Sequence, residues 1–266
     1  MPPLKANKIS AIFRSQIFDL AMFVLLVAVL VYLAVKSAGN IGYYWQWYQV
    51  PPLICSFGEN GFQAGPLLDG LLVTLKISAI SLFFSSLIGI IAALMRLSQS
   101  AVACLLSRLY LELIRNTPLL IQIFFIYFVL GPVIGLGRFA SAVLALSLFE
   151  GAYTSEILRS GILAIPKGQY EAADSLGLGK LSTYRYIILP QAIRKTLPPL
   201  ISQAVSLVKD SALVSTIAIY DLTMQAQALT IETFLTFEIW FTVALIYLFI
   251  TVLLSMTISL VERWLG

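Results

Sequence analysis

The sequence predicts an all-α fold, a polytopic transmembrane helical bundle of about six spans. Composition is the first reason, because 59% of the 266 residues are hydrophobic, 11% are charged and the mean hydropathy is +0.93. Soluble proteins carry about 25% charged residues, so most of this chain is expected to lie in lipid. The second reason is that apolar stretches of about 20 residues, enough to cross ~30 Å of hydrocarbon as a helix, recur along the chain. Their residues do not alternate in polarity with period two, which argues against a β-barrel.

The apolar stretches give the six helices in order. The second is interrupted only by Lys76, and the third carries charges only in its first two turns. The fourth contains three charged residues, the fifth contains two, and the sixth contains none. The expected spans are about Ile17 to Val35, Gly70 to Met95, Leu109 to Leu130, Phe139 to Ile162, Pro198 to Tyr220, and Ile239 to Val261.

Lysine and arginine residues between the spans predict the orientation. With a cytoplasmic N-terminus, thirteen of them fall on the inside, from Lys5, Lys8 and Arg14 to Arg263. Two further basic residues fall on the outside and two lie within spans. Because cytoplasmic loops carry the excess of positive charge, both termini are expected in the cytoplasm.

Several classes of function are excluded by what the sequence lacks. It has no histidine, which removes the usual imidazole metal site and Ser-His or Cys-His catalysis, so we expect no metal and no enzyme. The basic residues are dispersed between apolar stretches, which favours a membrane over nucleic acid as partner. Cys55 and Cys104 are expected on opposite faces of the membrane, where they cannot form a disulfide.

Two regions are expected. Residues 1–66 comprise an N-terminal cytoplasmic tail, one transmembrane helix and an external loop rich in tyrosine and tryptophan, and residues 67–266 form the main helical domain. A basic start before an apolar run is also typical of a secretory signal peptide. Because this run is longer than the core of such a signal and lacks a small-x-small cleavage site near Lys36, we expect a retained helix.

The largest expected cytoplasmic segment, about residues 160–197, predicts two short helices around a tight turn. Pro166 suits a helix start, while Gly177 and Gly179 permit a chain reversal. Ser182 can cap a second helix that ends before Pro190. The segment is expected to project from the bilayer as a compact unit.

This segment resembles the EAA loop of the permease subunits of binding-protein-dependent ABC importers. The residues that carry the likeness stand at the family spacing: Glu171, Ala172, Ala173, Gly177, Ile187, Leu189 and Pro190. Three further stretches resemble the polar amino-acid permeases of that superfamily, namely residues 115–122, 151–159 and 207–213. The likeness covers roughly residues 70–262, and the first 66 residues depart from it because compact members start at the second span.

The resemblance implies an ABC type I importer-like core in the bacterial inner membrane. Such a permease forms the pathway of an ATP-driven amino-acid importer, and the EAA loop couples it to a cytoplasmic ATPase dimer. Further implied partners are an external solute-binding protein, a second permease that is identical or related, the amino-acid substrate and membrane lipid. Cofactors of this chain are not expected, because Gly177 to Leu181 is no phosphate loop and ATP and Mg belong to the partner ATPase. Packing of the EAA residues against the permease itself is the alternative reading.

Charged residues deep in the spans are candidates for the substrate pathway. Glu150 and Asp210 reach the midplane at about 16–18 Å from the membrane faces, and Lys209 is adjacent. The alternative is a buried structural network of these three residues. A neutral residue is expected at position 150 in many relatives, so Glu150 points to a cationic substrate.

Two other charged pairs are expected to be structural. Glu112 with Arg115, and Glu156 with Arg159, are each three residues apart on a helix near its cytoplasmic end. A secondary transporter or channel for small polar solutes is the alternative function, although it gives no reason for the EAA spacing.

Overall fold

A computed structural model describes residues 16–40, 42–58 and 61–265. These residues divide into two compact units, the first up to Gln46 and the second from Trp47 onward. The expected cytoplasmic tail, with Lys5, Lys8 and Arg14, lies outside the described residues. Within the first unit, helix α2 (Gln16–Asn40) confirms a helix where the first span was expected. Its large apolar side chains are exposed around the helix, as in a membrane helix, but its apolar part covers only Phe18–Leu33.

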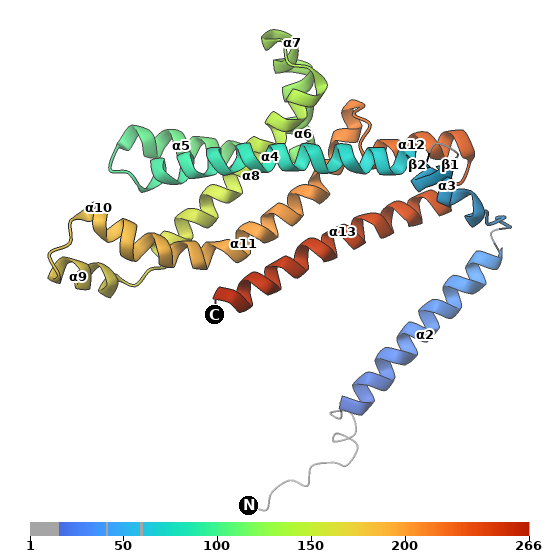
Figure 1. Cartoon of the computed structure of the whole chain (residues 1–266), viewed down its shortest axis with the longest axis horizontal. Helices are drawn as coiled ribbons and strands as arrows, with labels where there is room; N and C mark the ends of the chain where they lie inside the picture. Colours follow the sequence, from blue (N-terminus) through green and yellow to red (C-terminus); the bar gives the residue numbers. More distant parts are fainter. Residues whose placement is uncertain (1–15, 41, 59–60, 266) are drawn as a thin grey trace, which may run out of the picture. The chain divides into compact units, whose positions relative to one another are not determined.

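The second unit is helical apart from one short β-hairpin, so the predicted α-helical fold is confirmed (Figure 1). The segment expected as an external loop forms a short helix and this hairpin, in which Cys55 pairs with Ala64. The elements are η1 (Trp47–Gln49), α3 (Val50–Ile54), β1 (Cys55–Gly58), β2 (Gly61–Ala64), α4 (Pro66–Leu97), α5 (Ala101–Arg115), α6 (Leu119–Phe124), η2 (Phe125–Leu130), α7 (Gly131–Ile134), α8 (Arg138–Leu163), α9 (Lys167–Ser175), α10 (Lys180–Thr183), η3 (Tyr184–Ile188), α11 (Leu189–Asp210), η4 (Ser211–Ile217), α12 (Leu222–Thr233) and α13 (Thr236–Leu265).

Small residues hold the centre of this unit together. Helix α8 packs along α4 and also contacts α5, α6 and α11. A Cβ atom at Gly89 of α4 would lie 2.5 Å from the Thr154 side chain, and one at Gly151 would lie 2.8 Å from Ile88. The two backbones therefore approach closely because neither glycine carries a side chain.

The third expected span is wrong as a single straight helix. The chain breaks between Arg115 and Leu119, and the helices on either side are bent by 106°. A proline disfavours helical backbone in the residue before it, which is Thr117 here. The Gln122 side-chain amide then donates to the carbonyls of Ile114 and Thr117, at 2.8 and 2.9 Å, and satisfies backbone acceptors that the break exposes.

The second helix of the 160–197 segment does not end before Pro190. It begins at Lys180 rather than being capped by Ser182, and it continues without interruption to Ile217. A π-helical turn, η3, precedes Pro190, which occupies the first turn of α11. A proline is tolerated at the start of a helix, and the wider turn changes the hydrogen-bond pattern before it.

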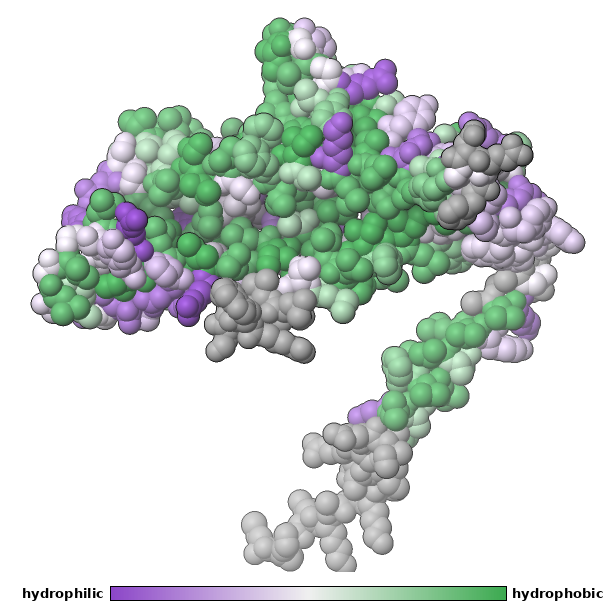
Figure 2. Space-filling view, viewed as in Figure 1, coloured by the Kyte–Doolittle hydropathy of each residue, from purple (hydrophilic) through white to green (hydrophobic). Residues whose placement is uncertain are grey.

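The expected count of six spans is not confirmed. By length and composition the described residues contain three helices that could cross a membrane, Pro66–Leu97, Lys180–Ile217 and Thr236–Ile258, or four if the bent pair is one span. Helix α8 is outside this set, and its buried residues include serines, a threonine and Glu150. Figure 2 shows hydrophobic surface over much of the second unit and polar residues gathered around α9 and α10.

Candidate functional site

The EAA residues form a helix and the turn that ends it. Glu171, Ala172 and Ala173 lie in α9, and Gly177 follows the helix with a left-handed φ of 71°. The Leu178 N–H donates to the Ala173 carbonyl at 3.1 Å, and the Gly177 N–H donates to the Asp174 carbonyl at 2.9 Å. This pair of bonds is a Schellman motif, which favours glycine at the left-handed position.

One side of the EAA segment packs inward and the other is exposed. Ala173 is fully buried, and Ile187 packs against a small core formed by Ile165, Ile188 and Ala192. The outward side is formed by exposed residues that include Glu171, Ala172, Leu176, Leu181, Leu189 and Pro190. Leu176 and Leu181 expose 77% and 83% of their surface. The segment therefore combines a fixed turn with two exposed leucines on a face that is otherwise largely polar.

The second part of the candidate site is centred on Glu150 in α8. This residue is only 1% exposed, and one carboxylate oxygen, Oε2, accepts a hydrogen bond of 2.6 Å from Nε2 of Gln203 in α11. The other oxygen, Oε1, is buried and has no hydrogen-bond partner. A cavity of about 130 Å³ lies beside the pair, and its walls come from α4, α8 and α11.

Among the described residues, neither Lys209 nor Asp210 is bonded to Glu150. Lys209 is exposed and Asp210 is half-buried at the end of α11. In the described part of the chain, the hydrogen bond of Glu150 comes from Gln203 rather than from either residue. The expected three-residue network is therefore not formed by direct bonds.

Gln203 is the residue that sequence reasoning missed. It lies seven residues before Asp210, or about two helical turns, so both occupy one face of α11. That spacing was the available signal, although it does not identify Glu150 as the partner.

The two expected ion pairs have different outcomes. Glu156 accepts from Arg159 and from Arg96 of α4, each at 2.5 Å, so this carboxylate joins two helices. The expected ion pair of Glu112 with Arg115 is not formed among the described residues. Asn116 donates to the Glu112 carboxylate at 2.8 Å, while the Arg115 guanidinium lies 5.6 Å from the centre of the Tyr153 ring. Asn116 closes α5 one helical turn after Glu112, and this spacing brings its amide to the carboxylate.

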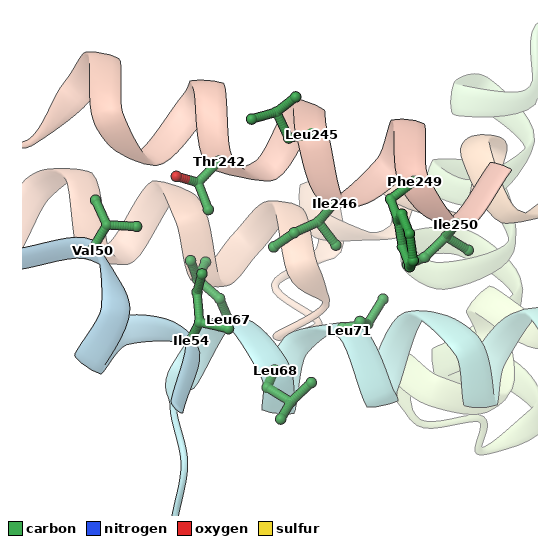
Figure 3. A pocket seen from close by; sticks show the side chains of 10 residues that line it. All are labelled: Val50, Ile54, Leu67, Leu68, Leu71, Thr242, Leu245, Ile246, Phe249 and Ile250. Atoms are coloured by element: carbon green, nitrogen blue, oxygen red, sulfur yellow. The ribbon is translucent and has the colours of Figure 1, made fainter. Parts of the chain in front are cut away.

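A larger groove of about 500 Å³ lies between α3, α4 and α13, and its chemistry differs (Figure 3). Its lining includes Leu67, Leu71, Ile246 and Phe249, and Thr242 supplies the only side-chain oxygen drawn there. Without a charged group, this groove offers nothing to a zwitterion. Within the described ranges, acidic residues and cysteines also form no cluster of three that could hold a metal.

Comparison with known proteins gives one consistent result. Residues 85–266 match the family described as binding-protein-dependent transport system inner membrane component. The glutamine transport system permease protein GlnP of Escherichia coli (strain K12) is 38% identical over 200 residues, 74% of this chain and 91% of that protein. A putative glutamine transport system permease protein GlnP of Rickettsia conorii is 37% identical over 199 residues, with the same two shares. The crystal structure of an amino acid ABC transporter with histidines matches with 38% identity and a TM-score of 0.71, covering 74% of this chain and 93% of that chain.

Proposed function

The chain belongs to the binding-protein-dependent transport system inner membrane component family and is the permease subunit of an ABC amino-acid importer, and we propose that it couples transport to ATP through residues 160–197. In this proposal the outer face of α9 and α10, with the exposed Leu176 and Leu181 at its turn, receives the ATPase, whose closure on ATP moves the membrane helices.

The carrying observation is the fixed geometry of that face. Ala173 is buried, Gly177 holds a left-handed turn, and Leu176 and Leu181 beside them are exposed. Exposed leucines of this kind, on a segment held by its own hydrogen bonds, suit a protein partner more than water. Glu171 and Ala172 then contribute to the contact surface, while Ile187 anchors the segment and Leu189 and Pro190 start α11.

The partners and the location follow from membership of the importer class. The protein is a multi-pass inner-membrane protein, and ATP is used by a separate ATPase. We propose a cytoplasmic ATPase dimer, an external solute-binding protein and a second permease, identical or related, as its partners. Both termini are proposed to be cytoplasmic, which places α9 and α10 on the ATPase side.

The proposed substrate pathway passes the cavity beside Glu150. Helices α4, α8 and α11 surround it, and α11 is continuous with the coupling segment. Asp210 and Lys209 lie about two turns further along the same helix than Gln203. We place them on the pathway beyond the cavity.

Gly177→Val tests the coupling proposal. Space is not the obstacle, because no atom lies within 4 Å of a Cβ built on Gly177, but a left-handed φ costs a residue with a side chain about 1–2 kcal/mol. We expect the native turn to lose a factor of roughly 5–30 in population. Uptake of amino acid by the reconstituted importer should fall, while ATP hydrolysis and membrane insertion persist.

Gly179→Val is the matched control. Gly179 has an ordinary extended backbone, with φ of −67° and ψ of 155°, and an equally open surrounding. The control variant should transport like the wild type. Normal uptake by Gly177→Val at normal abundance would count against coupling through this turn.

A further inference from the structure

A cluster of three arginines and one glutamate lies where α4, α5 and α8 pack together. Ala92, Leu111 and Ala152, one residue from each helix, form a buried core there. Residues four positions apart share a helix face, so the residues that follow these three by four positions border the core. They are Arg96, Arg115 and Glu156. Arg159, three residues after Glu156, completes this arginine cluster.

The single carboxylate of the arginine cluster does not balance its positive charge. Glu156 accepts from Arg96 and from Arg159, and the charge of Arg115 acts on it as well. Arginine stays charged in proteins, so three guanidinium groups and one carboxylate leave a net charge of +2. Glu112, one turn before Arg115, forms no ion pair with it among the described residues. The cluster therefore lacks negative charge.

Most N–H donors of the arginine cluster are also unused. A guanidinium group has five such donors, and the described residues show one hydrogen bond from Arg96 and one from Arg159, both to Glu156. Nε of Arg159 is buried without an acceptor. The Arg115 guanidinium lies over the Tyr153 ring instead of donating to a carboxylate. Because Arg96 and Arg159 keep 22% and 25% exposure of their side chains and Arg115 is exposed, the cluster is accessible to a ligand.

We propose that the arginine cluster binds a phosphate group, carried by an anionic phospholipid or by free inorganic phosphate. The planar guanidinium forms paired hydrogen bonds to phosphate oxygens, and the charge of a phosphate complements the net charge of the cluster. A guanidinium over a ring face, like that of Arg115, keeps its edge N–H groups for such an acceptor. This site goes beyond the proposed function, because neither ATPase coupling nor amino-acid recognition requires it.

An apolar hollow on the same helices favours the phospholipid. It has a volume of about 240 Å³, and its lining includes Ile91 and Met95 of α4 and Leu106 of α5. Met95 directly precedes Arg96. A phospholipid gains contact with this lining through an acyl chain, whereas inorganic phosphate uses only the arginines. In the proposed orientation the cluster also faces the cytoplasmic leaflet, in which anionic lipids are found. We therefore expect the lipid to bind more tightly.

Arg115→Gln tests the site in the full-length permease, purified without its ATPase so that no nucleotide site contributes. Arg115 donates no side-chain hydrogen bond within the described chain, so the fold should tolerate the change. In one arm, phosphatidylglycerol or phosphatidylethanolamine is titrated into delipidated protein, and bound lipid is counted by native mass spectrometry. In the other arm, binding of radiolabelled inorganic phosphate is measured by equilibrium dialysis. Loss of a charge-assisted hydrogen bond predicts at least about tenfold weaker binding of phosphatidylglycerol.

Three further variants separate a phosphate site from a general effect of charge or folding. Arg108→Gln removes an exposed arginine of α5 that is not among the charges acting on Glu156, so it should bind like the wild type. Arg115→Lys keeps the charge but loses the planar fork, and an intermediate loss is expected. Glu156→Gln removes the competing carboxylate, so it should bind the phosphate group more tightly while a folding defect would weaken binding.

The two arms identify the source of the phosphate group. Binding of phosphatidylglycerol that depends on Arg115 supports a lipid site, and binding of inorganic phosphate that depends on Arg115 supports a site for free phosphate. Three results would overturn the inference: no preference of the wild type for phosphatidylglycerol together with no phosphate binding, unchanged binding in Arg115→Gln, or equal losses in Arg115→Gln and Arg108→Gln. Weaker binding in Glu156→Gln would contradict the charge argument. Each of these results leaves the proposed function intact, because ATP-dependent amino-acid uptake is measured separately.

Discussion

Two carboxylates on helix α8, at Glu150 and Glu156, have opposite surroundings. Glu156 retains about 29% exposure of its side chain and is bound by Arg96 and Arg159. Glu150 is 1% exposed, and its partner is the neutral amide of Gln203. Burial without a cation normally opposes a carboxylate, and a charge deep in a membrane is a functional candidate by default. The comparison teaches that the charge of Glu156 is neutralised by neighbouring side chains whereas that of Glu150 is not, so only the first carboxylate is expected to stabilise the fold through its charge.

The largest expected effect on stability comes from Glu156→Gln. This change leaves Arg96 and Arg159 without their carboxylate partner, and Nε of Arg159 is already buried without a hydrogen-bond acceptor. We expect the free energy of unfolding to fall by about 1–3 kcal/mol. Reversible denaturation of the purified permease measures this, with Glu112→Gln as the exposed control. Equal effects of the two substitutions would remove the contrast between paired and unpaired carboxylates.

Glu150→Gln should have a smaller effect of the opposite sign. The side-chain amide keeps a carbonyl oxygen for the Gln203 donor, and an uncharged group costs less to bury than a carboxylate. We expect the free energy of unfolding to stay constant or rise by up to about 1 kcal/mol. The same denaturation assay measures it. A loss comparable to that of Glu156→Gln would show that Glu150 is part of the structural framework.

The last prediction needs no change in stability or transport, and it assigns the Glu156 ion pairs to one face of the membrane. Cys104 is near Arg96, because its Sγ is 3.7 Å from the Arg96 carbonyl, whereas Cys55 pairs with Ala64 in the hairpin. An impermeant thiol reagent outside intact spheroplasts should therefore modify Cys55 and spare Cys104. Detergent-solubilised protein should react at both. The reverse pattern would place the Glu156 pairs on the outer face and contradict the proposed orientation.

Hydropathy was sufficient to predict helices but not their interruptions. The positions of α2, α4 and α13 follow from long apolar stretches, which reflect local composition. The break before Leu119 depends on Thr117-Pro118 and on the Gln122 amide, and the continuity of Lys180–Ile217 depends on a π-helical turn before Pro190. In both cases a proline changes the backbone locally. Composition does not show whether the proline will break the helix, as at Pro118, or be accommodated in it, as at Pro190.

The candidate site was only partly predictable for a related reason. The turn at Gly177 follows from neighbouring residues, so its position was clear from the sequence. The bond between Gln203 and Glu150 joins residues 53 positions apart, and no local pattern links them. The pair of Glu156 with Arg159 was expected from its spacing, but the role of Arg96 was not, because it lies on another helix.

The helical segment from Lys180 to Ile217 is long enough to work as a lever if it moves as one body. Gln203 lies 23 residues after Lys180, a lever arm of about 35 Å at the helical rise. A tilt of roughly 5° about the Lys180 end would displace Gln203 by about 3 Å, which exceeds the slack in its 2.6 Å bond to Glu150. A small rotation at the Lys180 end would thus be amplified at the cavity beside Glu150, far from where the rotation is applied.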